Sequence, residues 1–231
     1  MLKIQLHCHC YGDPVDHINY SPKKLIDEAK RLDYDVLCIT LHRRLLFNKK
    51  LQKYAAKKRI LLLPGIEFEI NGKHILAINA HADILNVNNF KKLSNYRQNH
   101  CDTLIIAPHP FFPTNECLKK DLTDNIALFD AIEISWAYTK TKNYNKKAIE
   151  LAKKFNKPLI ATSDCHILSH LDNGFTFVEA KKDPRSFIEA VRKNKMKISS
   201  KPTSYLSIIR FFGQLFWQNF YRKLKKSKNK I

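Results

Sequence analysis

The chain has 231 residues, of which 44% are hydrophobic and 27% are charged, and its formal net charge is +20. The apolar content is ordinary for a globular protein with one full core. No apolar run is long enough to span a bilayer, and no glycine-rich phosphate loop of the GxGxxG or GxxxxGK[ST] type occurs.

The large positive charge favours a polyanionic partner, such as nucleic acid, an anionic membrane surface or a phosphorylated substrate. The alternative is a Lys-rich composition that is common to a whole genome. The six cysteines form no CxxC pair, and the N-terminus runs directly into a strand-like segment. We therefore expect a cytoplasmic protein with reduced thiols. The sequence does not predict an oligomeric state.

Strand-like apolar runs alternate with amphipathic, Lys-rich segments along most of the chain. Ser21 and Pro22 suit the N-cap and first turn of a helix, and Asn71-Gly72 predicts a hairpin turn. The expected strands cover residues 2–9, 35–40, 60–63, 66–70, 74–79, 103–107, 131–135, 158–162 and 176–179. The expected helices cover residues 21–32, 49–58, 90–100 and 143–155, with one more starting at 183 and another at about 203.

This alternation predicts an α/β fold with a largely parallel sheet. Polar residues recur at the C-terminal ends of the expected strands, where a β/α barrel carries its active site. We therefore expect a distorted TIM-like barrel rather than an open doubly wound sheet, within a domain of residues 1–200. Residues 201–231 are expected to form a basic amphipathic extension that is rich in aromatic residues.

Candidate metal ligands gather at these strand ends. His7 and His9 occupy alternate positions of the first strand, so both imidazoles face the same side. Imidazole and carboxylate groups together suit Zn, Mn or Fe. His81 and His100 are weaker alternatives to His74. The candidate ligands are His7, His9, His17, His42, Glu67, His74, His109, Asp164 and His166.

In their order and spacing these motifs resemble the PHP family of metal-dependent phosphoesterases, named for polymerase and histidinol phosphatase. The resemblance extends over residues 1–191. The matching elements are His-Cys-His at 7–9, Ile-Thr-Leu-His at 39–42, Gly-Ile-Glu at 65–67, His-Ile-Leu at 74–76, Ala-Pro-His-Pro at 107–110 and Ser-Asp-Cys-His at 163–166.

The resemblance implies a (β/α)7-type barrel that holds two or three divalent metal ions. One ion would lie between His7, His9, Glu67 and Asp164, and Glu67 would bridge it to a second ion on His74 and His109. A third ion would use His42, His166 and a residue of the loop after the first strand. Counting back from the helix start places that residue at His17, with Asp13 and Asp16 as alternatives.

Two departures from the family pattern concern the neighbours of these ligands. Leu41 stands where the family usually has Asp, so the hydrogen bonding near His42 must differ. Cys8, Cys10 and Cys165 stand where Thr, Ser or Ala are common. Since neighbouring residues on a strand point to opposite faces, we expect structural roles for these thiols rather than metal ligation.

The implied activity is metal-dependent hydrolysis of a phosphate ester, either a phosphomonoester, a nucleotide or a nucleic-acid end, by a metal-activated water. Asp164, His166 or His17 could carry the leaving-group proton. Arg43 and Arg44 are candidates for binding the substrate phosphate, with a solvated loop as the alternative.

Three further features leave alternatives open. Glu133 and Trp136 suit either the substrate pocket or an ordinary core. The C-terminal extension could pack on the barrel, or it could bind an anionic membrane surface or a nucleic-acid backbone. The alternative function is a metal-stabilised module that binds nucleic acid or a membrane without turnover.

Overall fold

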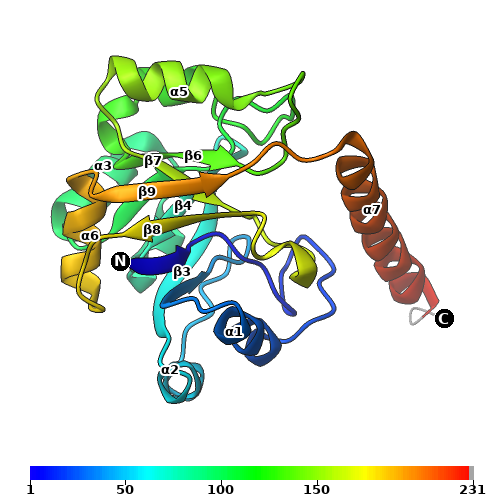
Figure 1. Ribbon diagram of the computed structural model, residues 1–231. Helices are drawn as coiled ribbons and strands as arrows, with labels where there is room; N and C mark the ends of the chain where they lie inside the picture. Colours follow the sequence, from blue (N-terminus) through cyan, green and yellow to red (C-terminus); the bar gives the residue numbers. More distant parts are fainter. Residues whose placement is uncertain (229–231) are drawn as a thin grey trace.

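A nine-stranded sheet in the order β7-β6-β5-β4-β3-β2-β1-β8-β9 organises the chain, and Figure 1 shows it in the computed structural model. The structure describes residues 1–228, and their side chains up to residue 220 except that of Asn219. The strands are β1 (Leu2–Gln5), β2 (Val36–Ile39), β3 (Leu61–Ile70), β4 (Lys73–Ile78), β5 (Leu104–Ala107), β6 (Ala131–Ser135), β7 (Leu159–Thr162), β8 (Gly174–Val178) and β9 (Met196–Ser200).

The sheet curls until its far strand meets β8. The Thr176 hydroxyl of β8 lies 2.9 Å from both the amide nitrogen and the carbonyl oxygen of Ala161 in β7. Strands β7 and β8 are thus joined by a side chain rather than by a ladder of backbone hydrogen bonds, and the barrel is nearly closed. The distorted TIM-like barrel predicted from the sequence is therefore confirmed.

The distortion comes from strand direction. Strands β1, β2 and β3 are mutually parallel, as are β5, β6 and β7, whereas β4, β8 and β9 each run antiparallel to their neighbours. The turn at Asn71-Gly72, with positive φ at both residues, reverses the chain between β3 and β4 as expected. Strand β9 was not expected from the sequence.

Two strand predictions were wrong. The first strand was expected to run to residue 9, but β1 ends at Gln5, so His7 and His9 lie in the segment that follows it. Residues 60–63 and 66–70 were expected as two strands around Pro64-Gly65, but β3 runs through both residues without a break. Pro64 fits because it pairs with Ile39 in a parallel ladder and its carbonyl accepts a hydrogen bond from Ala80. Gly65 fits because a Cβ there would lie 2.1 Å from the Cys38 Sγ.

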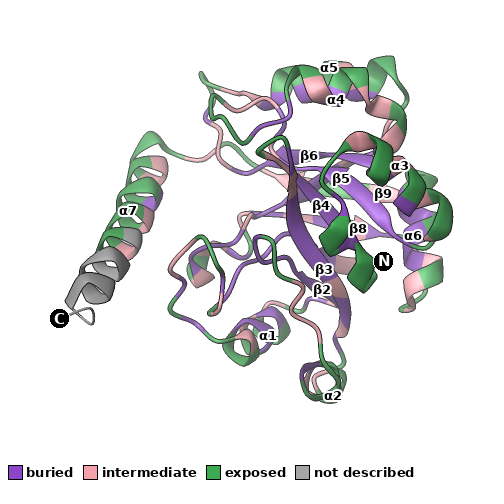
Figure 2. Cartoon of the chain, turned by 180° about the vertical axis from the view of Figure 1, so that it is seen from behind, coloured by how far each residue is buried: buried purple, intermediate pink, exposed green. Residues whose placement is uncertain are grey.

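Helices cover the outside of the sheet, and Figure 2 shows buried strands enclosed by helices with exposed outer faces. Strands β2 and β5 are buried at every position because both of their faces are covered. The α-helices are α1 (Pro22–Arg31), α2 (Lys49–Lys57), α3 (Phe90–Asn99), α4 (Lys120–Asp124), α5 (Asn145–Lys154), α6 (Pro184–Arg192) and α7 (Tyr205–Lys228), and the short 3-10 helices are η1 (Ala82–Asn86), η2 (Ile126–Leu128) and η3 (Leu168–His170).

Side-chain caps mark where several helices begin. Ser21 accepts a hydrogen bond from the Lys24 amide at the start of α1, and Asp183 accepts one from the Ser186 amide at the start of α6. Pro22 and Pro184 follow directly in the first turn, where a missing N–H has no cost. Both starts agree with the sequence-based prediction.

Helix α7 stands beyond the C-terminal ends of the strands (Figure 1). It contacts the barrel through Phe211, which is 6% exposed and packs against Trp136. Within residues 1–228, none of the helices combines the length and the apolarity that a membrane crossing requires. The basic run from Arg222 to Lys230 is evident in the sequence, but its side chains lie outside the described residues.

Candidate metal centre

Loops at the C-terminal ends of the parallel strands bring the predicted ligands together. His7 and His9 follow β1, His42 follows β2, and Glu67 lies within β3. Sets of three side chains offer ligand atoms within 4.8 Å of one another, and these sets overlap. Together they contain His7, His9, His42, Glu67, His74, His109, Asp164 and His166.

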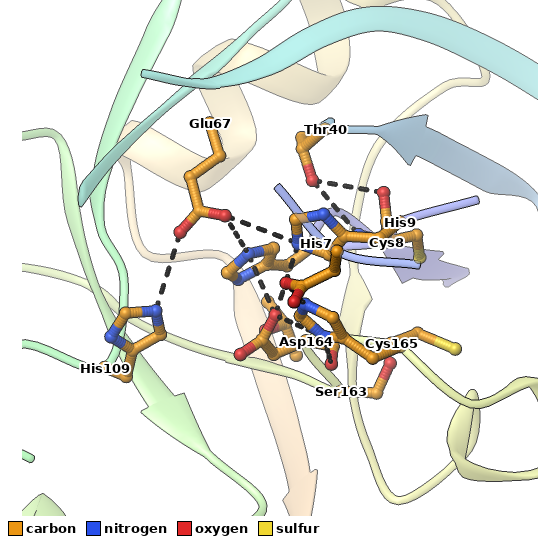
Figure 3. A network of polar contacts seen from close by, with 12 residues as sticks. His7, Cys8, His9, Thr40, Glu67, His109, Ser163, Asp164 and Cys165 are labelled. Atoms are coloured by element: carbon orange, nitrogen blue, oxygen red, sulfur yellow. Dashed lines mark hydrogen bonds and ion pairs between the residues drawn. The ribbon is translucent and has the colours of Figure 1, made fainter. Parts of the chain in front are cut away.

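Glu67 connects two groups of imidazoles, and Figure 3 shows its contacts to His109 on one side and to the histidines that follow β1 on the other. Its Oε2 lies 3.3 Å from the Nε2 of His7, 3.3 Å from that of His9 and 3.2 Å from that of His42. Its Oε1 lies 2.8 Å from the Nδ1 of His74 and farther, at 3.5 Å, from the Nε2 of His109. The two oxygens of one carboxylate therefore face two different groups of imidazoles, as a bridging ligand would.

Asp164 approaches the same imidazoles from the end of β7. Its Oδ1 lies 3.1 Å from the His7 Nε2 and 3.4 Å from the His9 Nε2. The Asp164 side chain is 26% exposed, so it lies between the buried histidines and the pocket above them.

Unusual backbone conformations direct two of these ligands inward. Asp164 has a φ of 44° and His109 has a φ of 29°, both in the left-handed region that non-glycine residues seldom adopt. Each follows the last residues of a parallel strand. Such strain costs roughly 1–3 kcal/mol and persists where the surroundings over-determine it, which is common at functional sites.

The loop after β1 supplies two carboxylates. Asp13 is buried, and its carboxylate lies 2.9 Å from the His9 Nδ1 and 3.0 Å from the His42 Nδ1. Asp16 lines the pocket, and its Oδ2 lies 3.1 Å from the His166 Nε2. His17 is the next residue and is partly buried. The choice of His17 as the loop ligand stays a prediction. Asp16 faces the pocket beside His166, whereas Asp13 contacts the Nδ1 atoms of His9 and His42, whose Nε2 atoms face Glu67.

The fit of a metal ion can be tested on buried atoms. The Nε2 atoms of His7 and His9, the Oε1 of Glu67, the Nδ1 of His74 and the Oδ1 of Asp164 are buried and make no hydrogen bond within the described chain. Unpaired buried polar atoms are costly and rare in native proteins. Five of them gather on the two sides of the Glu67 carboxylate, and this set of nitrogen and carboxylate donors fits a site for divalent cations.

Electrostatics within the cluster agree with this donor set. Burial alone would raise the pKa of Glu67, but His7, His42 and His74 together hold that pKa well below its usual range. Burial would lower the pKa of His7, but the carboxylates of Asp164, Glu67 and Glu133 raise it to about 10. The carboxylates therefore stay ionised and attract cations strongly.

Glu133 has a role that the sequence did not indicate. It is fully buried in β6, where its Oε1 lies 3.0 Å from the His7 Nδ1 and accepts a hydrogen bond from the Thr162 hydroxyl. Its Oε2 accepts a 2.6 Å hydrogen bond from the His109 amide. Glu133 therefore orients two candidate ligands from behind rather than lining the substrate pocket.

Cys117 was also missed as a partner of the centre. Its Sγ lies 3.4 Å from the Nδ1 of His109, whose Nε2 faces Glu67. Although burial would raise the pKa of the Cys117 thiol, the contact with His109 lowers it overall. In the sequence, Cys117 could have been noticed only because it follows the predicted ligand His109 by eight residues.

A pocket of about 490 Å³ opens above the ligands, and Asp16, Asp164 and His166 line it. Arg43 lines the rim of this pocket and pairs with Glu69 at 3.0 Å. Arg44 instead donates a hydrogen bond to the Gly12 carbonyl at 2.8 Å. Of the two arginines predicted to bind the substrate phosphate, Arg43 therefore lines the pocket and Arg44 does not.

The neighbours of the ligands face the core. Cys8, Cys10 and Cys165 pack in one buried apolar cluster with Leu41, away from the imidazoles. Next to Leu41, the Asp13 carboxylate accepts a hydrogen bond from the His42 amide and contacts the His42 ring.

Comparisons with known proteins agree with this architecture. Residues 142–196 match a family model described as PHP-associated. A search of curated protein sequences gives no match.

Solved structures with low sequence identity share the fold. A two-domain protein from Bacteroides vulgatus, described as containing a predicted PHP-like metal-dependent phosphoesterase, superposes with a TM-score of 0.68 at 19% identity, over 93% of this chain and 69% of that one. PsfC from Pseudomonas syringae gives a TM-score of 0.64 at 15% identity, over 96% and 98%. The lesion-specific endonuclease PfuEndoQ from Pyrococcus furiosus gives 0.60 at 18% identity, over 85% and 57%.

Proposed function

We propose that this chain, a PHP-type barrel by its fold and by its matching family model, is a metal-dependent hydrolase of phosphate esters. The observation that carries the proposal is the convergence of buried, unpaired imidazole and carboxylate atoms beneath an open pocket. Buried polar groups without hydrogen-bond partners destabilise a folded protein, and a bound cation would supply the missing partner.

Two or three divalent ions would share these residues. His7, His9 and Asp164 would hold one ion, His74 and His109 another, and Glu67 would face both because its two oxygens point to the two groups. His42 and His166, with a residue of the loop 13–17, would hold a third. When bound, such ions supply charge stabilisation at phosphorus and lower the pKa of water.

The side chains at the pocket would then handle protons and charge. Asp164 and His166 both line the pocket, so either could pass a proton to the leaving oxygen of the substrate. Asp16 holds the His166 Nε2 at 3.1 Å and thereby fixes the orientation of that ring. Arg43, 61% exposed at the rim, could leave Glu69 and contact the substrate phosphate.

The substrate class that we favour is a nucleotide or a nucleic-acid end, with a small phosphomonoester as the alternative. The net charge of +20 favours a polyanionic substrate. One protein of the same fold is named as an endonuclease, although this chain spans only 57% of its length.

Metal content and hydrolysis, measured on one purified sample, test the proposal. Bound Zn, Mn and Fe would be measured by elemental analysis. Phosphate release would be assayed on a generic phosphomonoester and on a short 5′-phosphorylated oligonucleotide, each with and without chelator. We expect two or three ions per chain and chelator-sensitive turnover.

Variants connect that turnover to the site. His109→Ala and Asp164→Ala should each abolish hydrolysis, whereas Glu150→Gln, on the exposed face of α5, should leave it unchanged. Full activity in either site variant would refute the assignment. Metal without turnover would favour the alternative of a metal-stabilised binding module.

A second proposal concerns α7, which we propose lies on an anionic membrane surface. Its exposed large apolar residues form one stripe at helical spacing, while Phe211 on another face packs on the barrel. No acidic residue follows Glu189, so this part of the chain complements negative charge. The exposed stripe consists of Tyr205, Leu206, Ile209, Phe212, Phe216, Trp217 and Phe220.

Sedimentation with vesicles tests this placement. The full chain should bind vesicles with anionic headgroups, bind neutral vesicles weakly, and be released by salt. Phe216→Ser with Trp217→Ser should weaken binding, and removal of residues 202–231 should abolish it. Binding to an oligonucleotide but not to vesicles would overturn the membrane proposal.

A further inference from the structure

A second cluster of histidines and acids lies at the opposite end of the barrel. Strands β4 and β5 are antiparallel, and Ile78 at the end of β4 pairs with Leu104 at the start of β5. The loop after β4 and the loop before β5 therefore meet. The metal centre lies beyond the other end of β5, where His109 follows the strand.

This meeting brings together His81 from the loop after β4, Asp83 from η1, and His100 and Asp102 from the segment between α3 and β5. The imidazole rings of His81 and His100 stack with centroids 4.2 Å apart and planes inclined by 18°. The His81 Nε2 lies 2.9 Å from the Asp102 Oδ1, and the His100 Nε2 lies 2.7 Å from the Asp83 Oδ2. Ligand atoms of His81, His100 and Asp102 all lie within 4.8 Å of one another.

Neighbouring side chains hold the cluster in place. Asn79 has a φ of 58°, which turns the chain at the end of β4, and its Nδ2 donates to the carbonyl and the Oδ2 of Asp102. The other oxygen of Asp102 is thereby directed to His81. The Tyr96 hydroxyl accepts a hydrogen bond from the His81 amide, and the Tyr96 ring packs 4.5 Å from that of His100. Metal-binding carboxylates and imidazoles are commonly fixed by outer contacts of this kind.

We propose that His81, His100, Asp102 and Asp83 form a second metal site, which binds one Zn²⁺ ion separately from the barrel centre. Two imidazoles and two carboxylates make a closed four-ligand set that suits zinc. Tetrahedral ligands about 2.1 Å from the ion lie about 3.4 Å apart. The two Nε2–carboxylate distances of 2.9 and 2.7 Å would widen to that spacing, and the other separations would shorten. The side chains come from η1 and from surface loops, so no buried strand needs to move.

Without metal, each Nε2–H donates to one carboxylate. Zinc would take the place of the proton between each Nε2 and its carboxylate, and each neutral ring would carry its proton on Nδ1 instead. The ion would then join all four side chains at once. The ligands lie at the two ends of the segment that contains η1 and α3. The ion would therefore cross-link the start and the end of the chain between β4 and β5. The site takes no part in the hydrolysis proposed above and needs no substrate.

Zinc binding to full-length protein tests the proposal. The wild type and each variant would be dialysed against Zn²⁺ alone, and bound zinc would be measured by elemental analysis. His81→Asn with His100→Asn should lose one zinc per chain relative to the wild type. His7→Asn with His9→Asn should lose zinc from the barrel centre and keep this one.

Two further variants test the carboxylates and the neighbouring thiol. Asp83→Asn with Asp102→Asn, which keeps both imidazoles, should lose the same single equivalent. Cys101→Ser should keep it, although this exposed thiol lies between two ligands in sequence. Equal zinc in the wild type and the His81/His100 variant, or loss of the equivalent in Cys101→Ser alone, would overturn the proposal.

A readout without elemental analysis uses hydrogen exchange. In the His7/His9 variant, added Zn²⁺ should slow amide exchange in residues 81–102, which include α3. Unchanged exchange there would also overturn the proposal. Failure of the barrel centre to bind metal would leave this result untouched, because the readout is taken in a variant that lacks the barrel imidazoles.

Discussion

Replacing Glu133 by Gln isolates the contribution of a residue that orients the candidate ligands without facing the pocket. Glu133 accepts hydrogen bonds only, from the His7 ring at 3.0 Å, from the His109 amide at 2.6 Å and from the Thr162 hydroxyl. Glutamine keeps the size of the side chain but turns one acceptor oxygen into an NH₂ donor. One of these partners must then face another donor.

Either orientation of the new amide is unfavourable. If the NH₂ group faces the His109 amide, two buried donors oppose each other. If it faces His7, that ring must accept through Nδ1 and carry its proton on Nε2. This Nε2 lies 3.3 Å from Glu67 and 3.1 Å from Asp164, so the proton would occupy the position of a metal bond.

The expected loss is therefore about 10- to 100-fold in metal affinity, or about 1.4–2.8 kcal/mol. Titration of the metal-free protein with Zn²⁺ or Mn²⁺ against a competing chelator measures it. Glu150→Gln, on an exposed helical face, is the matched control for the same chemical change. Unchanged affinity in a folded Glu133→Gln protein would refute the role assigned to this carboxylate.

Three other perturbations have defined outcomes. Gly65→Ala should destabilise the protein by about 1–3 kcal/mol or more, since the new Cβ would lie 2.1 Å from the Cys38 Sγ, and Cys38→Ala should recover part of the loss in urea unfolding. Asp130→Asn should cost about 3–5 kcal/mol, because Arg97 and Arg192 would lose a buried carboxylate. Burial would raise the pKa of Asp130, but these arginines lower it overall. The ionised carboxylate therefore stabilises the fold fully above the unfolded-state pKa of about 3.9, and this stabilisation is lost as the pH falls through the folded-state pKa. Equal acid sensitivity of the wild type and the Asp130→Asn variant would contradict this. Removing metal with a chelator should lower the unfolding temperature by about 5–10 °C if the ions are present at 100 times their dissociation constant, and an unchanged melting curve would contradict metal binding to the folded state.

The sequence indicated which candidate side chains would lie together because most of them stand at strand ends, where the period of the strand and the order of the chain determine position. His7 and His9 could be assigned to one side of the chain by alternation alone, and both contact Glu67 and Asp164. The barrel followed from the alternation of apolar runs and amphipathic segments.

Other features depend on contacts between segments that are distant in sequence. Glu133 stands inside an apolar strand, and only the closed barrel shows that it meets His7, which precedes it by 126 residues. The continuity of β3 depends on Cys38 filling the space above Gly65. The cluster of His81 and His100 depends on the antiparallel pairing of β4 with β5, which no local pattern reports.

The spread of the ligands along the chain has a consequence for biosynthesis. His7 and His9 leave the ribosome before the rest of the barrel, whereas Asp164 and His166 emerge only after most of the barrel has been made. Contacts of such long sequence separation form slowly, because the intervening loop must close before any contact compensates its entropy. A nascent chain that stops before residue 164 presents its early histidines without their late partners. The proposed metal centre would therefore be complete only after synthesis has passed His166, and ions acquired earlier would be bound by an incomplete and exchangeable set of ligands.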